Sequence, residues 1–424
     1  MSENLLQFIW LHRFYNSQTA LKTIEGEKII VIHPGILNTN AGPDFLEAQL
    51  KIGETLWAGN IEIHIKSSDW NKHHHHTDMK YSKLILHVVY EYDAPIETLN
   101  QTMFPTLELK NAINLDLLQR YEKLLSSKKF IACENVISQV KPLTVQQQLS
   151  RMLAERLEEK TYLIADMLHK FNNDWHHVFY IQLARGFGLH INQDAFEQLA
   201  LQTPLNLLAK HKHNCLQIEA LLFGQAGFLF DYFDEDYPIL LQKEYAYLSK
   251  LYNLQAIDKY HWKFLRLRPA NFPTLRIAQF ASLVVDSNQL LSKIFEVNSI
   301  KEIYQLFNIR VSNYWLNHYN FQEKSIFRNK SLGTSFVSTL IINAIIPTLF
   351  IYGKLQGRDE YCNKAIRFLE EINSESNSII QAWSDLGIPI QSAADSQALL
   401  QLKNKYCDSK RCLECSIGYS ILKI

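Results

Sequence analysis

The sequence predicts an α+β fold: an N-terminal helix with a small mixed β-sheet, a large all-α domain, and a cysteine-rich, metal-binding tail. Apolar and polar residues alternate between about residues 27 and 110, which is the period of half-buried strands. From about residue 111 onward, apolar residues recur every three or four positions, which is the period of amphipathic helices. We therefore expect an α/β domain at 1–125, a helical domain in two parts at 126–235 and 236–400, and the tail at 401–424.

Composition supports a globular protein of more than one domain. The chain has 424 residues, which exceeds the usual size of a single core. Hydrophobic residues make up 47% and charged residues 20%, as in ordinary folded proteins. Basic and acidic residues balance at 43 each, so global charge does not indicate a nucleic-acid or membrane partner. Any basic groove has to be local.

The sequence favours a cytoplasmic location without a membrane partner. The first residues carry Glu3 where a signal peptide has positive charge, and polar residues interrupt their apolar run. The most apolar later stretch, 336–353, contains Asn343 and Pro347, so we expect a buried helix there. Six cysteines in a chain of this length do not resemble a secreted disulfide framework.

The N-terminal domain is expected to begin with a helix opened by Ser2 and to continue as strands separated by polar turns. The segment "NTNAGPD" (38–44) is typical of a loop because it is rich in Asn, Gly and Pro. The expected strands are 28–37, 45–53, 56–66, 83–93 and 105–109.

The strand "IEIHIK" (61–66) concentrates polar groups on one face. Successive side chains point to opposite faces of a strand, so three Ile face one side and Glu62, His64 and Lys66 face the other. The simplest interpretation is a solvent-facing edge with ordinary alternation. The alternative is a functional face, because Asp44 begins the preceding strand and a hairpin would bring it to Glu62.

Two converging carboxylates suit a hard divalent cation. Asp44 and Glu62 would bind Mg²⁺ or Mn²⁺, which prefer oxygen ligands. His64 or Lys66 would then orient or deprotonate the attacking water. These residues are the predicted catalytic set.

This arrangement resembles the restriction-endonuclease-like, or PD-(D/E)xK, nucleases. Pro43-Asp44 matches the first element of their motif, and Glu62-Ile63-His64 occupies the second, with His64 where the family has lysine. Glu3 on the first helix would supply the additional acidic ligand that some of these nucleases carry. The resemblance implies a phosphodiesterase or nuclease acting on nucleic acid.

Other histidines suggest a second kind of metal site. His87 lies within a predicted strand, where a core histidine is the ordinary interpretation. His73 to His76 form a run whose ordinary interpretation is a solvated loop. An antiparallel neighbouring strand would nevertheless bring His87 near His64, and one loop histidine could complete a mixed nitrogen and oxygen site for Zn²⁺ or Mn²⁺. A zinc-dependent hydrolase is therefore an alternative, without HExxH spacing to support it.

The tail contains Cys407, Cys412 and Cys415 in a C-x4-C-x2-C pattern. Thiolates at such spacing in a reducing compartment are usually metal ligands, for zinc or a [4Fe–4S] cluster. Cys362 or Cys133 would be the fourth ligand, and we assign Cys362 to the site. Some nucleases of the superfamily named above hold such a cluster with three late cysteines and a distant one.

Arg266, Arg268 and Arg276 alternate with aromatic residues in "WKFLRLRPANFPTLRIAQFA" (262–281). Guanidinium groups with stacking aromatics are typical of nucleic-acid contacts. The ordinary interpretation is a helix whose aromatic residues form core.

Stretches along the whole chain resemble an uncharacterised bacterial family, the domain of unknown function 2851. They include "HPGILNTNAGPDF", "WAGNIEIHIKSSDW", "LILHVVYE", "RPANFPTLRIAQ" and "RCLECSIG". The resemblance implies no activity. Besides the two enzymes, a non-catalytic scaffold that binds nucleic acid or protein, with a degenerate nuclease fold and a structural metal, stays a hypothesis.

Overall fold

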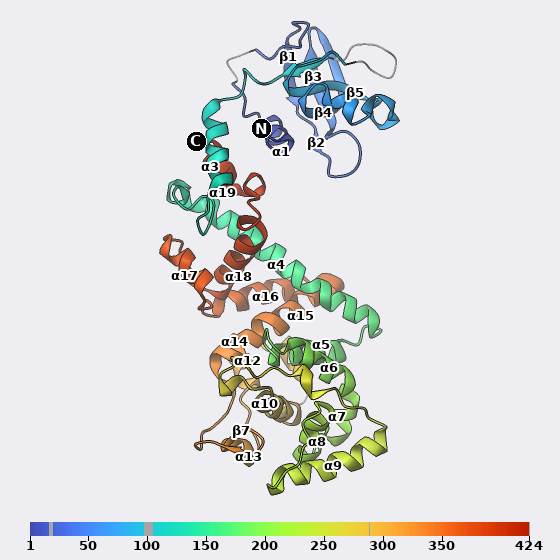
Figure 1. Ribbon diagram of the computed structural model, residues 1–424, viewed down its shortest axis with the longest axis vertical. Coiled ribbons are helices and arrows are strands. Elements are labelled where there is room, and N and C mark those ends of the chain that lie inside the picture. Colours follow the sequence, from blue (N-terminus) through green and yellow to red (C-terminus); the bar gives the residue numbers. More distant parts are fainter. Residues whose placement is uncertain (17–19, 97–104, 288, 424) are drawn as a thin grey trace. The chain divides into compact units, whose positions relative to one another are not determined.

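The structure is a computed structural model of the chain, shown in Figure 1. It describes residues 1–16, 20–96, 105–287 and 289–423. The chain forms two compact units, the first made of Met1–Gln148 with Leu402–Ile424 and the second of Leu149–Gln401. The cysteine-bearing tail therefore belongs to the first unit.

The boundary expected between residues 235 and 236 does not divide the helical part. Helix α8 (Cys215–Gln225) precedes this point and α9 (Asp236–Tyr252) follows it, and the two helices pack against each other. A Cβ at Gly224 of α8 would lie 2.1 Å from the Tyr245 ring of α9, so the absence of a side chain permits this approach. The acidic, Pro-containing break is a turn within one core.

The first unit is built on a mixed six-stranded sheet in the order β1-β3-β4-β5-β6, with β2 also pairing with β3. The long central strand β4 pairs antiparallel with β3 and parallel with β5. The strands are β1 (Ile29–His33), β2 (Ile36–Leu37), β3 (Phe45–Ile52), β4 (Thr55–Lys66), β5 (Leu84–Glu91) and β6 (Thr106–Glu108).

Strands β3 and β4 form the predicted hairpin, with Phe45 opposite Ile61 and Ile52 opposite Thr55. Gly53 supplies the positive φ of +57° that the tight turn requires. The register shifts between Phe45 and Ala48, and Glu47 in this bulge has a φ of 58°. A bulge locally twists its strand, and here it lies immediately beside Asp44.

Strand β5 runs parallel to β4, so the antiparallel pairing expected for the His87 strand is wrong. Parallel neighbours need a crossover of about a dozen residues or more, and residues 67–83 provide it. The crossover contains α2 (Asp69–Lys72) and single 3₁₀ turns at His75–Thr77 and Met79–Tyr81. Trp70 and Tyr81 are buried in a small cluster that anchors the crossover. The histidine run is therefore held over β4 and β5.

Helix α1 (Glu3–His12) begins as predicted. Ser2 adopts an extended conformation, and its Oγ accepts a hydrogen bond from the Leu5 N–H, which satisfies a free donor of the first turn. The helix buries its apolar residues against β4. Helices α3 (Leu115–Ser126) and α19 (Ser416–Lys423) pack together in the same unit.

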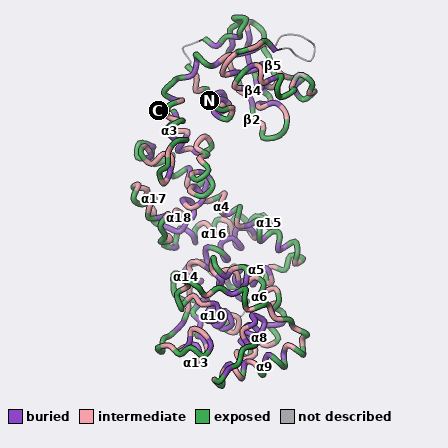
Figure 2. Tube along the Cα trace, in the orientation of Figure 1, coloured by how far each residue is buried: buried purple, intermediate pink, exposed green. Residues whose placement is uncertain are grey.

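The second unit is helical, with an apolar core that appears as buried segments along its helices in Figure 2. A short hairpin of β7 (His318–Asn320) and β8 (Glu323–Lys324) interrupts the helices, which periodicity did not predict. Long helix α4 (Pro142–Lys170) begins in the first unit and continues into the second. The other helices are α5 (Trp175–Phe187), α6 (Gln193–Gln202), α7 (Leu205–His211), α10 (Pro273–Asp286), α11 (Leu290–Glu296), α12 (Ile300–Leu306), α13 (Asn313–Leu316), α14 (Thr334–Leu340), α15 (Ile346–Gln356), α16 (Asp359–Glu371), α17 (Ser378–Asp385) and α18 (Ala393–Gln401).

Among the described residues, one helical stretch, Thr334–Gln356, has the length and apolarity that a membrane crossing needs. Within its most apolar window, 72% of the residues are buried inside the fold. A π-helical turn (Ile341–Ile345) precedes Pro347 and accommodates the missing N–H of that residue. The Asn343 side chain in this turn accepts a hydrogen bond from Lys160. The stretch is a core helix, as its polar residues predicted.

Candidate metal centre

Asp44 and Glu62 lie next to each other across the β3–β4 hairpin. The Asp44 N–H donates to Glu62 Oε2 at 3.0 Å, and the Ile63 N–H donates to Asp44 Oδ2 at 3.0 Å. The Gln7 amide of α1 donates to Asp44 Oδ1 at 2.9 Å. The hairpin register thus brings the two acidic residues to one place, and α1 helps to fix the first of them.

The polar face of β4 is buried at Glu62 and His64, so this part of the strand is not a solvent-facing edge. Glu62 is 5% exposed and His64 is 1% exposed, because β3 and β5 flank the strand and the crossover covers it. Burial raises the pKa of Glu62, and the neighbouring charge of Asp44 raises it further. Burial also raises the pKa of Asp44, to which the charge of Glu3 contributes. In the described part of the chain, neither Asp44 nor Glu62 pairs with a lysine or arginine.

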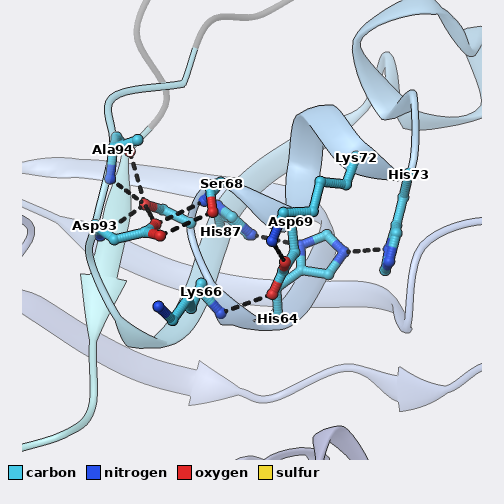
Figure 3. A network of polar contacts seen from close by, with 10 residues as sticks. His64, Lys66, Ser68, Asp69, Lys72, His73, His87, Asp93 and Ala94 are labelled. Atoms are coloured by element: carbon cyan, nitrogen blue, oxygen red, sulfur yellow. Dashed lines mark hydrogen bonds and ion pairs between the residues drawn. The ribbon is translucent and has the colours of Figure 1, made fainter.

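His64 lies at the centre of a histidine network (Figure 3). Its Nδ1 is 2.8 Å from Nε2 of His87 on β5, and its Nε2 is 3.2 Å from Nδ1 of His73. His87 lies opposite Glu62 in the parallel register, so both share the face that carries His64. Burial lowers the pKa of His64 to about 3 and lowers that of His87 well below its ordinary value. Both shifts favour the neutral imidazole, which is the form that binds metals.

His64, His73 and His75 bring one ring nitrogen each to within 4.8 Å of one another. Glu62 adds an oxygen: its Oε1 is 3.6 Å from His64 Nε2 and 3.3 Å from His75 Nε2. Zn–N bonds of about 2.0–2.1 Å in a tetrahedron place neighbouring ligands about 3.3 Å apart. The 3.2 Å between His64 Nε2 and His73 Nδ1 and the 3.3 Å between Glu62 Oε1 and His75 Nε2 are close to that edge length. Glu62 lies beside the three nitrogens rather than within 4.8 Å of all of them. These four groups are called the histidine centre below.

The crossover holds the two loop histidines in place. The His75 ring lies 4.1 Å from the Tyr81 ring and 5.3 Å from the Trp70 ring. At the start of the crossover, Asp93 accepts hydrogen bonds from the Ser67 hydroxyl at 3.0 Å and the Ser68 N–H at 2.9 Å. Figure 3 shows this anchor beside the His64 contacts. The sequence marked the histidine run but did not select His73 and His75 from it.

Lys66 and Glu3, which the sequence predicted to act with Asp44 and Glu62, differ in their positions. The Lys66 N–H donates to Asp69, while its exposed side chain acts on the pKa of Glu91 and Asp93. Lys66 is the last residue of β4, where the crossover begins. Glu3 is half-buried on α1, and its charge acts on both Asp44 and Glu62.

The three arginines expected to contact nucleic acid do not form one surface. Arg266 and Arg268 are exposed on the segment before α10. Arg276 is 6% exposed, donates to Gln279 and Asn271, and lies 3.4 Å from the Phe336 ring centre. Arg276 is thus a core residue whose charge is stabilised by amide oxygens and an aromatic face.

The tail cysteines gather with Cys133 rather than with Cys362. Cys133, Cys407, Cys412 and Cys415 line one small cavity of the first unit. Cys362 belongs to α16 in the second unit, where its thiol contacts the Phe350 carbonyl at 3.4 Å. The assignment of Cys362 as the fourth ligand is corrected on this geometry.

Comparison with known proteins identifies the family. The family described as "Protein of unknown function (DUF2851)" matches residues 3–378, and the chain belongs to it. No curated protein and no solved structure matches the chain.

Proposed function

We propose that this DUF2851 protein is a metal-dependent hydrolase whose metal is held by His64, His73 and His75, with Glu62 beside it as the general base. The observation that carries the proposal is the set of three imidazole nitrogens within 4.8 Å of one another, with Glu62 Oε1 3.6 Å from His64 Nε2 and 3.3 Å from His75 Nε2. Three nitrogen ligands with an open fourth position suit Zn²⁺, and also Mn²⁺. A bound divalent ion would also offset the negative charge of the buried carboxylates Asp44 and Glu62. In the described part of the chain, neither of them pairs with a lysine or arginine.

Each residue of the histidine centre has a separate role. A metal of this kind lowers the pKa of a bound water to about 7 and so supplies a nucleophile at neutral pH. The three histidines hold the ion, and His87 fixes the ring of His64 from behind. Glu62 Oε1 is within reach of the same point and can accept the proton of the water. His73 is exposed, so a substrate can approach from its side.

Phosphodiesters, nucleic acid included, are the substrate class that we propose. Their hydrolysis needs a metal to neutralise the charge that develops on phosphate oxygens. Lys72 and Lys80 flank the histidine run in the sequence; Lys72 pairs with Asp69 at 2.6 Å, and exposed Lys80 offers positive charge to such a substrate.

The test is a cleavage assay on a simple aryl phosphodiester, DNA and RNA with Zn²⁺, Mn²⁺ or Mg²⁺. We expect His73→Ala and Glu62→Gln to lose at least about 100-fold in rate, the lower range for a general base. His74→Ala is the matched control, because His74 is a neighbouring exposed histidine outside the cluster. Equal rates in all four proteins, or no cleavage with any ion, would refute the proposal.

A second candidate is a restriction-endonuclease-like centre with Mg²⁺ or Mn²⁺ on Asp44, Glu62 and Glu3. The juxtaposition of Asp44 and Glu62 across the hairpin favours it, and the engagement of both Asp44 oxygens by Gln7 and Ile63 weighs against it. Cleavage that depends on Mg²⁺ and is lost in Asp44→Ala and Glu3→Ala but retained in His73→Ala would select this candidate. Metal binding without cleavage would instead favour the non-catalytic scaffold.

A further inference from the structure

Four cysteines from distant parts of the chain surround one cavity, away from the histidine centre. Cys133 lies in the segment between α3 and α4, while Cys407, Cys412 and Cys415 come from the last residues of the chain. None of the four takes part in a disulfide; three are partly buried and Cys415 is buried. Together they are called the four-cysteine site. It is separate from the proposed function and does not depend on it.

The backbone around the four-cysteine site is specialised to present sulfur atoms. Cys407 ends a π-helical turn (Leu402–Cys407), a rare conformation that concentrates at functional sites. Cys412 begins a single 3₁₀ turn, and Cys415 directly precedes α19. Gly418 faces this turn: a Cβ there would lie 2.1 Å from the Cys412 carbonyl oxygen. The glycine thus lets α19 close against the C-x2-C turn.

Basic side chains near the sulfurs are already paired with acidic ones. Arg411 lines the cavity and pairs with Glu414. Lys403, in the turn that ends at Cys407, pairs with Asp408. Four thiolates gathered around one cavity therefore need a cationic centre between them.

The spacing of the sulfurs selects the kind of centre. A tetrahedral zinc ion with Zn–S bonds of 2.3 Å would bring its sulfurs to within about 3.8 Å of one another. Among the four cysteines, all of them in the described part of the chain, no three sulfurs lie within 4.8 Å of each other. A cubane cluster keeps its four cysteine sulfurs farther apart, because each binds a different iron. We propose that Cys133, Cys407, Cys412 and Cys415 bind a [4Fe–4S] cluster.

The position of the ligands in the chain gives this cluster a role. Cys133 precedes the second unit and the other three follow it, since that unit comprises Leu149–Gln401. The cluster therefore joins the two segments of the first unit that the second unit separates in sequence. It acts as a clamp that holds the end of the chain on the N-terminal unit, as a structural metal site does.

The test is anaerobic purification of the full chain, followed by iron, sulfide and zinc analysis and visible absorption. We expect about four irons and four sulfides per chain with a broad charge-transfer band. Cys133→Ser should lose the band and most of the iron. Cys362→Ser, a free cysteine outside the site, should keep both. Stoichiometric zinc without iron, an iron content in Cys133→Ser equal to the wild type, or no bound metal would overturn the proposal.

A second measurement uses the wild type alone, in case the Cys133 variant does not fold. Alkylation of native protein, read by mass spectrometry, should leave the four site cysteines unmodified while Cys215 and Cys362 react more readily. Oxidative removal of the cluster followed by reduction should expose the four. Equal protection before and after this treatment would contradict the cluster.

Discussion

Replacing His87 with phenylalanine should weaken metal binding at the histidine centre without unfolding the protein. His87 is completely buried, and its Nε2 is 2.8 Å from Nδ1 of His64. When a metal occupies Nε2 of neutral His64, Nδ1 carries the proton and donates it to His87. Phenylalanine keeps the bulk of the ring and removes the acceptor, so the orientation of His64 loses its support.

The expected magnitude follows from this single contact. Loss of the partner of a metal-binding histidine typically lowers affinity about 10–100-fold, which is about 1.4–2.7 kcal/mol. The folding free energy of the metal-free protein should change little. His87 Nδ1 is a buried atom with no hydrogen-bond partner in the described structure, and the substitution removes it while leaving His64 Nδ1 without its acceptor. A buried polar atom without a hydrogen-bond partner costs about 1–3 kcal/mol of folding free energy. The substitution removes one such atom, His87 Nδ1, and creates another, His64 Nδ1, so the gain and the cost offset each other.

The assay is a titration of metal-free protein with Co²⁺, followed by absorption spectroscopy. Cobalt bound to thiolates shows sulfur-to-metal charge transfer, so binding at the cysteines is distinguished from binding at imidazoles. Urea unfolding in the presence of a chelator measures stability independently, and His74→Ala serves as the control. An affinity in His87→Phe within about twofold of the wild type, with normal folding, would refute the support assigned to His87.

Three further predictions concern stability and the crossover. Burial raises the pKa of Glu219 from 4.5 to about 7. The Glu219 carboxylate accepts hydrogen bonds from Tyr237 and Ser312. The contribution of Glu219 to stability is therefore complete below pH 4.5 and is lost as the pH rises through 7. In urea unfolding, the stability of Glu219→Gln relative to the wild type should rise by about 3 kcal/mol between pH 4.5 and 8. A difference that stays constant with pH would contradict this. Gly224→Ala should destabilise the second unit by about 1–3 kcal/mol in thermal unfolding, because its Cβ meets the Tyr245 ring, whereas Gly333→Ala, with open space around the new atom, should not. Asp93→Ala should lower the Co²⁺ affinity, because it removes the acceptor that holds Ser67 and Ser68 at the start of the crossover. Asp93→Asn keeps one acceptor oxygen and should lose less affinity. Equal losses of affinity in the two variants would argue against a hydrogen-bonding role.

The sequence predicted the contact between Asp44 and Glu62 because only local information sets it. Both residues belong to one hairpin with a tight turn at Gly53, and the register of such a hairpin follows from the turn and the apolar pattern. The bulge at Glu47 was not predictable, because an ordinary residue adopts the left-handed conformation there. The alternation of β4 predicted two faces, but it could not reveal that Glu62 and His64 on the polar face are buried.

The choice of histidines depended on tertiary structure. Whether β5 runs parallel or antiparallel to β4 decides which side of the sheet residues 67–83 cover, and periodicity is the same in both cases. The parallel arrangement sends the crossover over Glu62 and His64. Packing of Trp70 and Tyr81 then selects His75. Neither contact has a signal in a single sequence.

The fourth cysteine of the site could not be chosen from the sequence, because it is distant from the other three along the chain. Cys407, Cys412 and Cys415 are recognisable as a set because their spacing is local. Cys133 and Cys362 are equally plausible partners in the sequence, since each is an isolated cysteine near helical segments. The division of the chain into units resolves the choice, because the tail packs with residues before 149.

Anomalous X-ray diffraction at the zinc absorption edge, from crystals grown with Zn²⁺, tests the histidine centre most directly. The account predicts a single ion about 2.0–2.1 Å from His64 Nε2, His73 Nδ1 and His75 Nε2, with Glu62 beside it. An ion held by Asp44 and Glu62 without these nitrogens, or no ion on this face of the sheet, would contradict it.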